Sequence, residues 1–297
     1  MKDEEKQILL MLYGLGSDVL VTPHLLRCLG GDIVLQKGIF VFYGYLMPMK
    51  KRFELIKKAG FDSVMIWWGD GTGDFEGDKF AYRSLAEKYD LNICNAHLPF
   101  DDCNNLWLET SVGDEYADII CKQITECGEF QIPTVVMHLT RGLTPPPYNK
   151  AGLERLKKIV DAAESHNVNL ALENLRFIEY IDFVFQNINL SNVGFCFDSG
   201  HNNCFTHDMD VLNKYKQHLF ALHLNDNMGD ADIHMLPFDG TSNWDRIIKT
   251  LKEIKYNGIL SLEVQQDRHE KYHGLSPENY LAMAFERAVR IEQGLML

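Results

Sequence analysis

Six apolar runs of this sequence each end in a side chain that can bind a metal or move a proton. These residues are His97, His138, Glu173, Asp198, His223 and Glu263. One such residue alone is usually structural, with its hydrogen bonds satisfied. Three carboxylates brought together in a buried place, however, would repel one another unless a cation lay among them. Imidazole with carboxylate is a ligand set typical of zinc, manganese, iron or cobalt. The pattern therefore predicts a divalent metal site, provided that the runs converge in the fold.

Further polar and aromatic residues stand close to the same run ends. They are Trp67, Trp68, Arg141, Asn174, His201, Asn225, Asp232 and His234. We expect His201 to orient a substrate oxygen or to shuttle a hydroxyl proton. Asp232 and His234 would be either further metal ligands or hydrogen-bonding partners of a substrate. Because successive side chains of a strand point to opposite faces, one of the adjacent tryptophans should face the site. The two tryptophans, the arginine and the two asparagines are candidates for substrate contacts, and an aromatic ring at the site would suit the apolar face of a sugar.

The elements that would position these residues alternate regularly from residue 39 onward. Short apolar runs lie at 39–43, 63–67, 91–97, 134–139, 169–173, 193–198, 219–224 and 258–264. Each is followed by a longer segment, and eight strand-then-helix units over about 250 residues are typical of a (β/α)8 barrel. A doubly wound open sheet would more often show a glycine-rich dinucleotide turn after its first strand, which Tyr43-Gly44-Tyr45 does not provide. Because the carboxyl ends of barrel strands converge at one mouth, the six run ends should be neighbours.

Helical periodicity is clear in several of the longer segments. Apolar residues recur at three- and four-residue intervals in 49–59, 115–127, 152–166, 244–254 and 277–291. Gly60 and the pair Asn257-Gly258 follow two of these segments, where a left-handed C-cap residue is favoured. Residues 1–38 fall outside the repeat and hold one helical pattern at 4–13. We therefore divide the chain into an N-terminal extension, 1–38, and a barrel, 39–297.

Composition excludes several classes of protein. With 42 acidic and 29 basic residues the formal net charge is −13, whereas a nucleic-acid-binding protein normally carries a basic face. No apolar run approaches membrane length, and the N-terminus opens on acidic residues where a signal peptide would be positive. The seven cysteines form no C-x-x-C pair, which favours reduced, buried thiols. We therefore expect a cytoplasmic protein with no membrane partner; a homo-oligomer is left open.

Several motifs in this order give the chain a family resemblance. They read NAHLPF, VVMHLTRG, LALEN, CFDSGH, ALHLNDN, GDADIHMLPFDG and LSLEV. Over residues 39–290 the chain resembles the xylose isomerase-like TIM barrel superfamily. That superfamily contains sugar and sugar-phosphate isomerases and epimerases together with apurinic/apyrimidinic endonucleases of the endonuclease IV type. The resemblance implies a (β/α)8 barrel with a metal-dependent active site at its mouth.

The resemblance implies one of two metal centres. In the epimerase branch a single divalent ion, Zn, Mn, Co or Mg, would be held by Glu173, Asp198, His223 and Glu263. The endonuclease branch has a trinuclear zinc site whose nine positions all find a counterpart. These are His97, His138, Glu173, Asp198, His201, His223, Asp232, His234 and Glu263. The ligands alone do not separate the branches, because several of these motifs also occur in members that are not nucleases.

Charge near the expected mouth favours the epimerase branch. The segment 69–78 and the pair Asp101-Asp102 are acidic, and such a rim would repel DNA. We therefore expect a small sugar or sugar phosphate as the substrate. One of Glu173 and Glu263 would remove a proton and the other return one, through an enediolate that the metal stabilises. The alternatives are an endonuclease IV-type zinc phosphodiesterase and a barrel that binds a polyol without turning it over.

Overall fold

The barrel expected from the sequence is confirmed. The computed structural model describes residues 34–70 and 79–296. Its eight parallel strands are β1 (Lys37–Phe40), β2 (Ser63–Trp67), β3 (Asn92–His97), β4 (Thr134–Met137), β5 (Asn169–Glu173), β6 (Val193–Asp198), β7 (Leu219–His223) and β8 (Leu260–Leu262). They pair in the order β7-β6-β5-β4-β3-β2-β1-β8. Just past β7, the Leu224 amide donates to the Ser261 carbonyl at 2.9 Å, which joins the two ends of the sheet into a ring.

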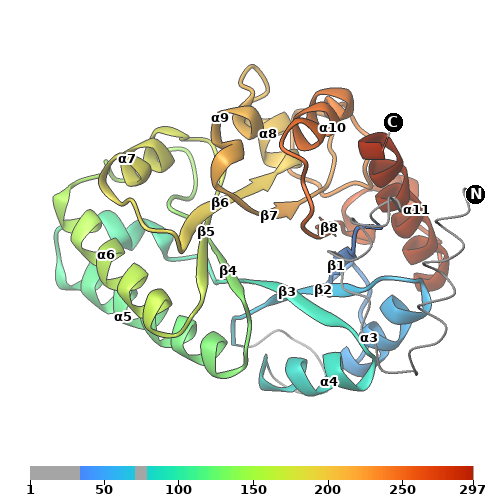
Figure 1. Ribbon diagram of the computed structural model, residues 1–297, viewed down its shortest axis with the longest axis horizontal. Helices are drawn as coiled ribbons and strands as arrows, with labels where there is room; N and C mark the ends of the chain where they lie inside the picture. Colours follow the sequence, from blue (N-terminus) through green and yellow to red (C-terminus); the bar gives the residue numbers. More distant parts are fainter. Residues whose placement is uncertain (1–33, 71–78, 297) are drawn as a thin grey trace, which may run out of the picture. The chain divides into compact units, whose positions relative to one another are not determined.

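Helices surround this ring of strands (Figure 1). They are α3 (Met49–Lys58), α4 (Tyr82–Lys88), α5 (Ser111–Glu129), α6 (Lys150–Ser165), α7 (Glu179–Asn187), α8 (Ser199–Phe205), α9 (Val211–Tyr215), α10 (Trp244–Glu253) and α11 (Pro277–Met296). Short 3₁₀ segments lie at Lys79–Ala81, Cys103–Trp107, Lys216–His218, Gln266–Arg268 and Glu270–Tyr272. With helices outside and side chains filling the ring, the strands are covered on both faces. This explains their nearly continuous apolar sequences.

Strand boundaries follow the apolar runs, with differences at a few ends. β2, β5 and β6 begin and end where predicted, whereas β1 begins at Lys37, two residues before the predicted run. β8 is shorter than predicted, and it pairs with β1 only from Lys37–Leu260 to Ile39–Leu262. Glu263 therefore lies just beyond β8, as His138 lies just beyond β4.

Two expected helix ends had different outcomes. Gly60 has φ +104° after α3, and its amide donates to the Lys57 carbonyl, so this left-handed C-cap is confirmed. The Asn257-Gly258 prediction was wrong, because Lys255 takes the left-handed conformation after α10, with φ +52°. The Lys255 amide donates to the Lys252 carbonyl, which closes the helix before the glycine is reached.

An apolar layer inside the ring supports the strand ends. Val136, Ala171, Cys196 and Ala221 pack together and are all buried. Each stands two residues before a run-end residue of β4, β5, β6 or β7, so it points to the same face of its strand. The polar run ends therefore rest on an apolar floor, which holds their backbones in fixed positions.

Several expectations concern residues outside this description or properties of the whole chain. The helical pattern at 4–13 and most of the segment 69–78 lie outside the described residues. The division at residues 38 and 39 stays a prediction. Cys94, Cys103, Cys121, Cys127, Cys196 and Cys204 are free thiols, three of them fully buried. Among the helices of the described residues, none combines the length and the apolar character needed to span a bilayer.

Candidate active site

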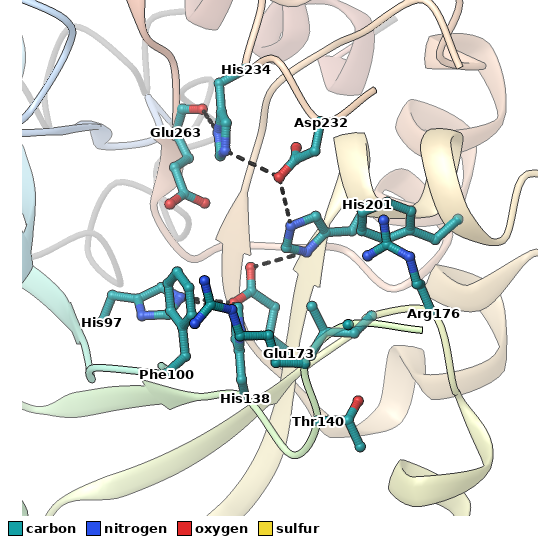
Figure 2. Close-up of a pocket in the computed structure, with 14 residues that line it drawn as sticks. His97, Phe100, His138, Thr140, Glu173, Arg176, His201, Asp232, His234 and Glu263 are labelled. Carbon is teal, nitrogen blue, oxygen red and sulfur yellow. Dashed lines mark hydrogen bonds and ion pairs between the residues drawn. The ribbon is translucent and has the colours of Figure 1, made fainter. Parts of the chain in front are cut away.

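Six strands bring their polar end residues to one mouth. His97, Glu173, Asp198 and His223 are the last residues of β3, β5, β6 and β7. His138 and Glu263 follow β4 and β8 directly. All six are buried, with exposed fractions between 0 and 8%. Figure 2 shows His97, His138, Glu173 and Glu263 pointing toward a common centre. The expected convergence of the run ends is therefore present.

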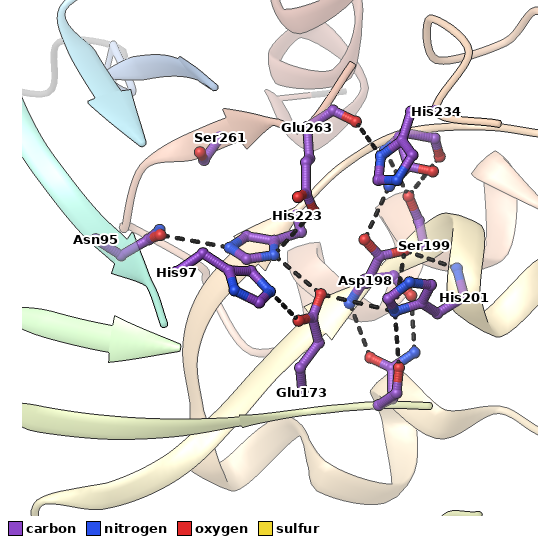
Figure 3. A network of polar contacts seen from close by, with 12 residues as sticks. Asn95, His97, Glu173, Asp198, Ser199, His201, His223, His234, Ser261 and Glu263 are labelled. Atoms are coloured by element: carbon purple, nitrogen blue, oxygen red, sulfur yellow. Dashed lines mark hydrogen bonds and ion pairs between the residues drawn. The ribbon is translucent and has the colours of Figure 1, made fainter. Parts of the chain in front are cut away.

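Glu173 lies at the centre of the contacts. One carboxylate oxygen, Oε2, lies 3.0 Å from His97 Nε2 and 2.7 Å from His138 Nε2. The other, Oε1, lies 3.0 Å from His223 Nδ1, and that nitrogen is also 3.0 Å from Glu263 Oε2 (Figure 3). Two carboxylates from opposite parts of the ring thus meet at one imidazole nitrogen.

Four of these residues form what we call the inner group: Glu173, Asp198, His223 and Glu263. Each offers one ligand atom, and these four atoms all lie within 4.8 Å of one another. His97 forms a similar cluster with Glu173 and His223. Three carboxylates with one imidazole fit a divalent cation by charge and by donor type. The residues present are therefore suited to a metal of the kind that the sequence predicts.

Electrostatics around the inner group also call for positive charge. Burial, together with the facing carboxylates, raises the pKa of Asp198 to about 7. Burial acts on Glu173 in the same direction, but the neighbouring His223 and His138 imidazoles hold its pKa well below the usual range. His223 is buried too, yet the neighbouring Cys196 sulfur and the Glu263 and Glu173 carboxylates raise its pKa well above the ordinary value. The carboxylates of the inner group thus favour positive charge at their centre, which a divalent ion would supply.

A second cluster, which we call the outer group, consists of His201, Asp232 and His234. Asp232 Oδ2 lies 3.3 Å from His201 Nε2 and 3.4 Å from His234 Nε2. The other nitrogen of His234, Nδ1, is 2.9 Å from the Glu263 carbonyl, and this contact directs Nε2 toward Asp232. His201 Nδ1 lies 3.7 Å from Glu173 Oε1, so the two groups are adjacent (Figure 2). Asp232 and His234 come from the loop after β7.

The asparagines predicted as substrate contacts hold Asp198 instead. The Asn174 side chain donates to the Asp198 carbonyl and accepts from its amide, each at 2.8 Å. Asn225 Nδ2 donates to Asp198 Oδ2 at 2.9 Å. Both asparagines are fully buried. Similarly, Asn95 Oδ1 lies 3.4 Å from His223 Nε2, on the side away from the carboxylates. These amides fix the orientation of inner-group residues.

An open pocket of ≈ 270 Å³ lies above the inner group. It is lined by His97, Phe100, His138, Thr140, Arg141, Gly142, Glu173, Leu175, Arg176, His201, Phe205, Asp232, His234 and Glu263. Sequence reasoning identified Arg141 but missed Arg176, although it stands only three residues after Glu173. Phe100 and Phe205 were also missed. Their signal was their position after motifs of the site: Phe100 follows HLP directly, and Phe205 stands four residues after His201, one turn further along α8.

The two adjacent tryptophans lie on opposite sides of β2, as expected. The Trp67 ring stacks on His97, with ring centres 5.5 Å apart. Trp68 is fully buried on the helix side, where its Nε1 donates to Glu126 at 3.0 Å. Trp67 therefore faces the site from behind His97, and the aromatic rings that line the pocket are those of Phe100 and Phe205.

The acidic rim expected at 101–102 is not part of this pocket. Asp101 and Asp102 line a separate hollow beside α5. Asp101 also pairs with the Arg141 guanidinium at 2.5 Å, which offsets its charge. The described part of the pocket rim thus carries two arginines. Residues 101–102 therefore give less reason to exclude DNA as a substrate than the sequence suggested. Most of the other acidic segment, 69–78, lies outside the described residues.

Comparison with known proteins gives one clear family match. A family model described as xylose isomerase-like TIM barrel matches residues 53–286. Among curated proteins, an uncharacterized protein, y4fM, of Sinorhizobium fredii is 30% identical over 177 residues, which cover 54% of this chain and 55% of that protein. An inosose isomerase of Bacillus velezensis is 24% identical over 80% of this chain and 90% of its own length.

Solved structures give the same fold. A D-tagatose 3-epimerase-like protein matches with a TM-score of 0.69 and 21% identity, covering 89% of this chain and all of its own. An L-ribulose 3-epimerase matches with a TM-score of 0.70 and 16% identity, covering 89% of this chain and 95% of its own. At these identities the matches show a shared barrel architecture.

Proposed function

This chain belongs to the xylose isomerase-like TIM barrel family, and on that premise we propose that it is a metal-dependent isomerase or epimerase of a sugar or sugar phosphate. The observation that supports this most strongly is the meeting of Glu173 and Glu263 at His223 Nδ1, each at 3.0 Å. Such a pair places two carboxylates on either side of one small volume. The likeness to proteins named inosose isomerase and D-tagatose 3-epimerase-like protein supports the same class.

In this proposal the inner group holds a divalent metal ion. The ion would polarise a carbonyl and an adjacent hydroxyl of the substrate and stabilise the negative charge that develops on their oxygens. Zinc, manganese, cobalt and magnesium all accept ligands of this kind. Asn225 and Asn174 keep Asp198 oriented toward the group. Oxygen-bearing substrates can reach Glu173 and Glu263, because both line the pocket.

Glu173 and Glu263 are the proposed acid and base. One carboxylate removes the proton from the carbon next to the carbonyl, and the other delivers a proton. Delivery to the opposite face of the same carbon gives an epimer, whereas delivery to the neighbouring carbon exchanges an aldose and a ketose. His201 lines the same pocket beside Glu173 and is placed to hold a substrate hydroxyl or to carry its proton.

Replacing these carboxylates tests the chemistry. Glu173→Gln and Glu263→Gln should each reduce deuterium uptake from heavy water into a ketose by about 10²- to 10⁴-fold, the usual contribution of a general acid or base. The measurement is proton NMR of the recovered ketose. Glu179→Gln, an exposed position in the first turn of α7, is the matched control and should exchange at the normal rate. Undiminished exchange in both site variants would remove the two residues from the mechanism.

A multinuclear zinc phosphodiesterase is the second candidate, and the outer group favours it. A single-metal isomerase needs no further cluster of two imidazoles and a carboxylate beside the inner group. All nine positions of a trinuclear site are near one another here, through the contacts of Glu173, Asp232 and their partners. The same pocket could also bind a polyol without turnover, which is the third alternative.

Metal content separates these candidates. We expect close to one divalent ion per chain, measured by mass spectrometry of protein purified without chelator. Three zinc ions per chain, with cleavage of a duplex that contains an abasic site, would establish the phosphodiesterase instead. One ion per chain without deuterium exchange on any ketose would favour the binding protein.

A further inference from the structure

Two arginines reach the pocket through matched stacks of side chains. Phe100 stacks on His138 with ring centres 4.5 Å apart, and the Arg141 guanidinium carbon lies 5.8 Å from the Phe100 ring centre. Phe205 stacks on His201 at 5.3 Å, and the Arg176 guanidinium carbon lies 3.5 Å from the Phe205 ring centre. Each stack therefore runs from a buried histidine through a phenyl ring to a guanidinium. The phenyl rings keep both positive charges outside the ligand cluster.

The two guanidinium groups differ in how their donors are used. Arg141 Nη1 donates to the carboxylate of Asp101 at 2.5 Å. Arg176 is exposed, and within residues 34–70 and 79–296 its guanidinium contacts the Phe205 ring but makes no hydrogen bond or ion pair. Figure 2 shows Arg176 beside His201, across the pocket from Glu263. The stack on Phe205 fixes the plane of this guanidinium while leaving its donors open.

Neither arginine can help to bind a metal cation, because like charges repel. A guanidinium fork instead matches the oxygens of a phosphate or a carboxylate, often through two parallel hydrogen bonds. Stacking on an aromatic ring is a common way to orient such a fork, since it uses the face of the group and leaves its edge free. An arginine with open donors on the rim, beside a second arginine that is paired with Asp101, therefore indicates an anionic ligand.

We propose that the substrate carries a terminal oxyanion, a phosphate monoester or a carboxylate, that binds Arg176, with Arg141 as a second contact. This inference rests on the proposed function, because the carbonyl end of the same molecule would lie at Glu173 and Glu263. The pocket of ≈ 270 Å³ is slightly below the roughly 300–1,000 Å³ of typical ligand sites, which suits one small molecule. The substrate class is thus a sugar phosphate or a sugar acid rather than a neutral sugar.

Binding of three related probes tests this assignment. D-fructose 6-phosphate, D-glucuronate and D-fructose are titrated by calorimetry into the protein as purified with its metal. At least one of the two anions should bind about tenfold or more tightly than D-fructose, as expected for hydrogen bonds to a charged group. Arg176→Met should remove most of that preference, Arg176→Lys should keep part of it, and Arg141→Met should have a smaller effect because Arg141 is shared with Asp101.

Arg290→Met is the matched control. Its guanidinium carbon lies 3.8 Å from the Phe238 ring centre, in the same kind of stack, but Arg290 does not line the pocket. This variant should keep the full preference for the anion. Thermal unfolding of all four variants checks that each is folded.

Several results would overturn the inference. These are equal affinity for all three probes, a preference that Arg176→Met leaves intact, or Arg176-dependent binding of an abasic DNA duplex alone. Deuterium exchange keeps this failure separate from failure of the proposed function. Exchange on neutral ketoses with no anion preference would overturn the anion site and spare the isomerase. An Arg176-dependent anion preference without exchange on any ketose would overturn the isomerase and spare the anion site.

Discussion

The inner and outer groups are both made of histidines and carboxylates, but they are built on different supports. The inner group stands at the ends of four strands, and its residues are at most 8% exposed. The outer group takes His201 from α8 and Asp232 and His234 from the loop after β7, and the Asp232 side chain is 28% exposed. Strand ends fix side chains more precisely than loops do, so the comparison separates a centre built wholly on strand ends from one built partly on a loop.

Charge balance separates the two groups as well. The inner group has three carboxylates for one imidazole, whereas the outer group has one carboxylate for two imidazoles. Burial would raise the pKa of Asp232, but His234 and His201 hold it well below the usual range, and in return His234 has its pKa raised to about 9. Two imidazoles thus face the single carboxylate of the outer group. The inner group has more carboxylates than imidazoles, which is why we propose it, and not the outer group, as the metal site.

The largest expected effect comes from neutralising an inner carboxylate. Asp198→Asn keeps an acceptor for the His201 amide, which now lies 2.6 Å from Asp198 Oδ1, but weakens a proposed ligand. Metal content should fall well below one ion per chain, and exchange should fall by about 10²- to 10³-fold, as expected for several kcal/mol of lost stabilisation. Metal analysis and NMR measure the two.

Asp226→Asn is the control for burial of this first variant. Asp226 is fully buried on the next strand-end loop, where it accepts from Trp244 Nε1 at 2.8 Å. This variant should lower the melting temperature while keeping the metal. Equal metal loss in both variants would show that general destabilisation, and not ligand loss, explains the result for Asp198.

A smaller effect is expected from the support of the inner group. Asn225→Ala removes the amide that orients Asp198 Oδ2, and loss of such a partner typically costs 10- to 100-fold in metal affinity or activity. Metal affinity can be measured by competition with a chromophoric chelator. Asn202→Ala removes a buried side-chain amide of α8 that donates to the Thr206 carbonyl, just past the helix, and should leave the affinity unchanged. If both variants lose affinity equally, the role of Asn225 is structural only.

The smallest effect is expected in the outer group. Asp232→Asn should retain close to one ion per chain and reduce exchange only about tenfold, because it disturbs the contact with His201 without removing an inner ligand. Metal analysis and exchange are measured on the same sample. If the unmutated protein holds three ions and this variant loses two of them, the outer group binds metal as well, which would support the phosphodiesterase.

The inner group could be predicted from the sequence because barrel topology is regular. Glu173 and Asp198 end strands whose limits matched the apolar runs, and alternation along each strand placed them inside the ring. The adjacent tryptophans followed the same rule. Predictions that depended on turns were less successful, since Lys255 replaced the expected glycine after α10. A helix ends where its last backbone carbonyls find hydrogen-bond donors, whether or not a glycine stands nearby.

The amino-acid sequence by itself determined the barrel, the strand ends and the set of residues available for a metal. Only the tertiary structure decided that Asn174 and Asn225 hold Asp198, that Asp101 pairs with Arg141, and that Arg176 is left open on the rim. The reason is physical. The periodicity of the sequence specifies which face of a strand a residue occupies. Hydrogen bonds over 2.5–3.5 Å depend instead on the paths of loops and on side-chain rotamers, which no repeating sequence pattern predicts.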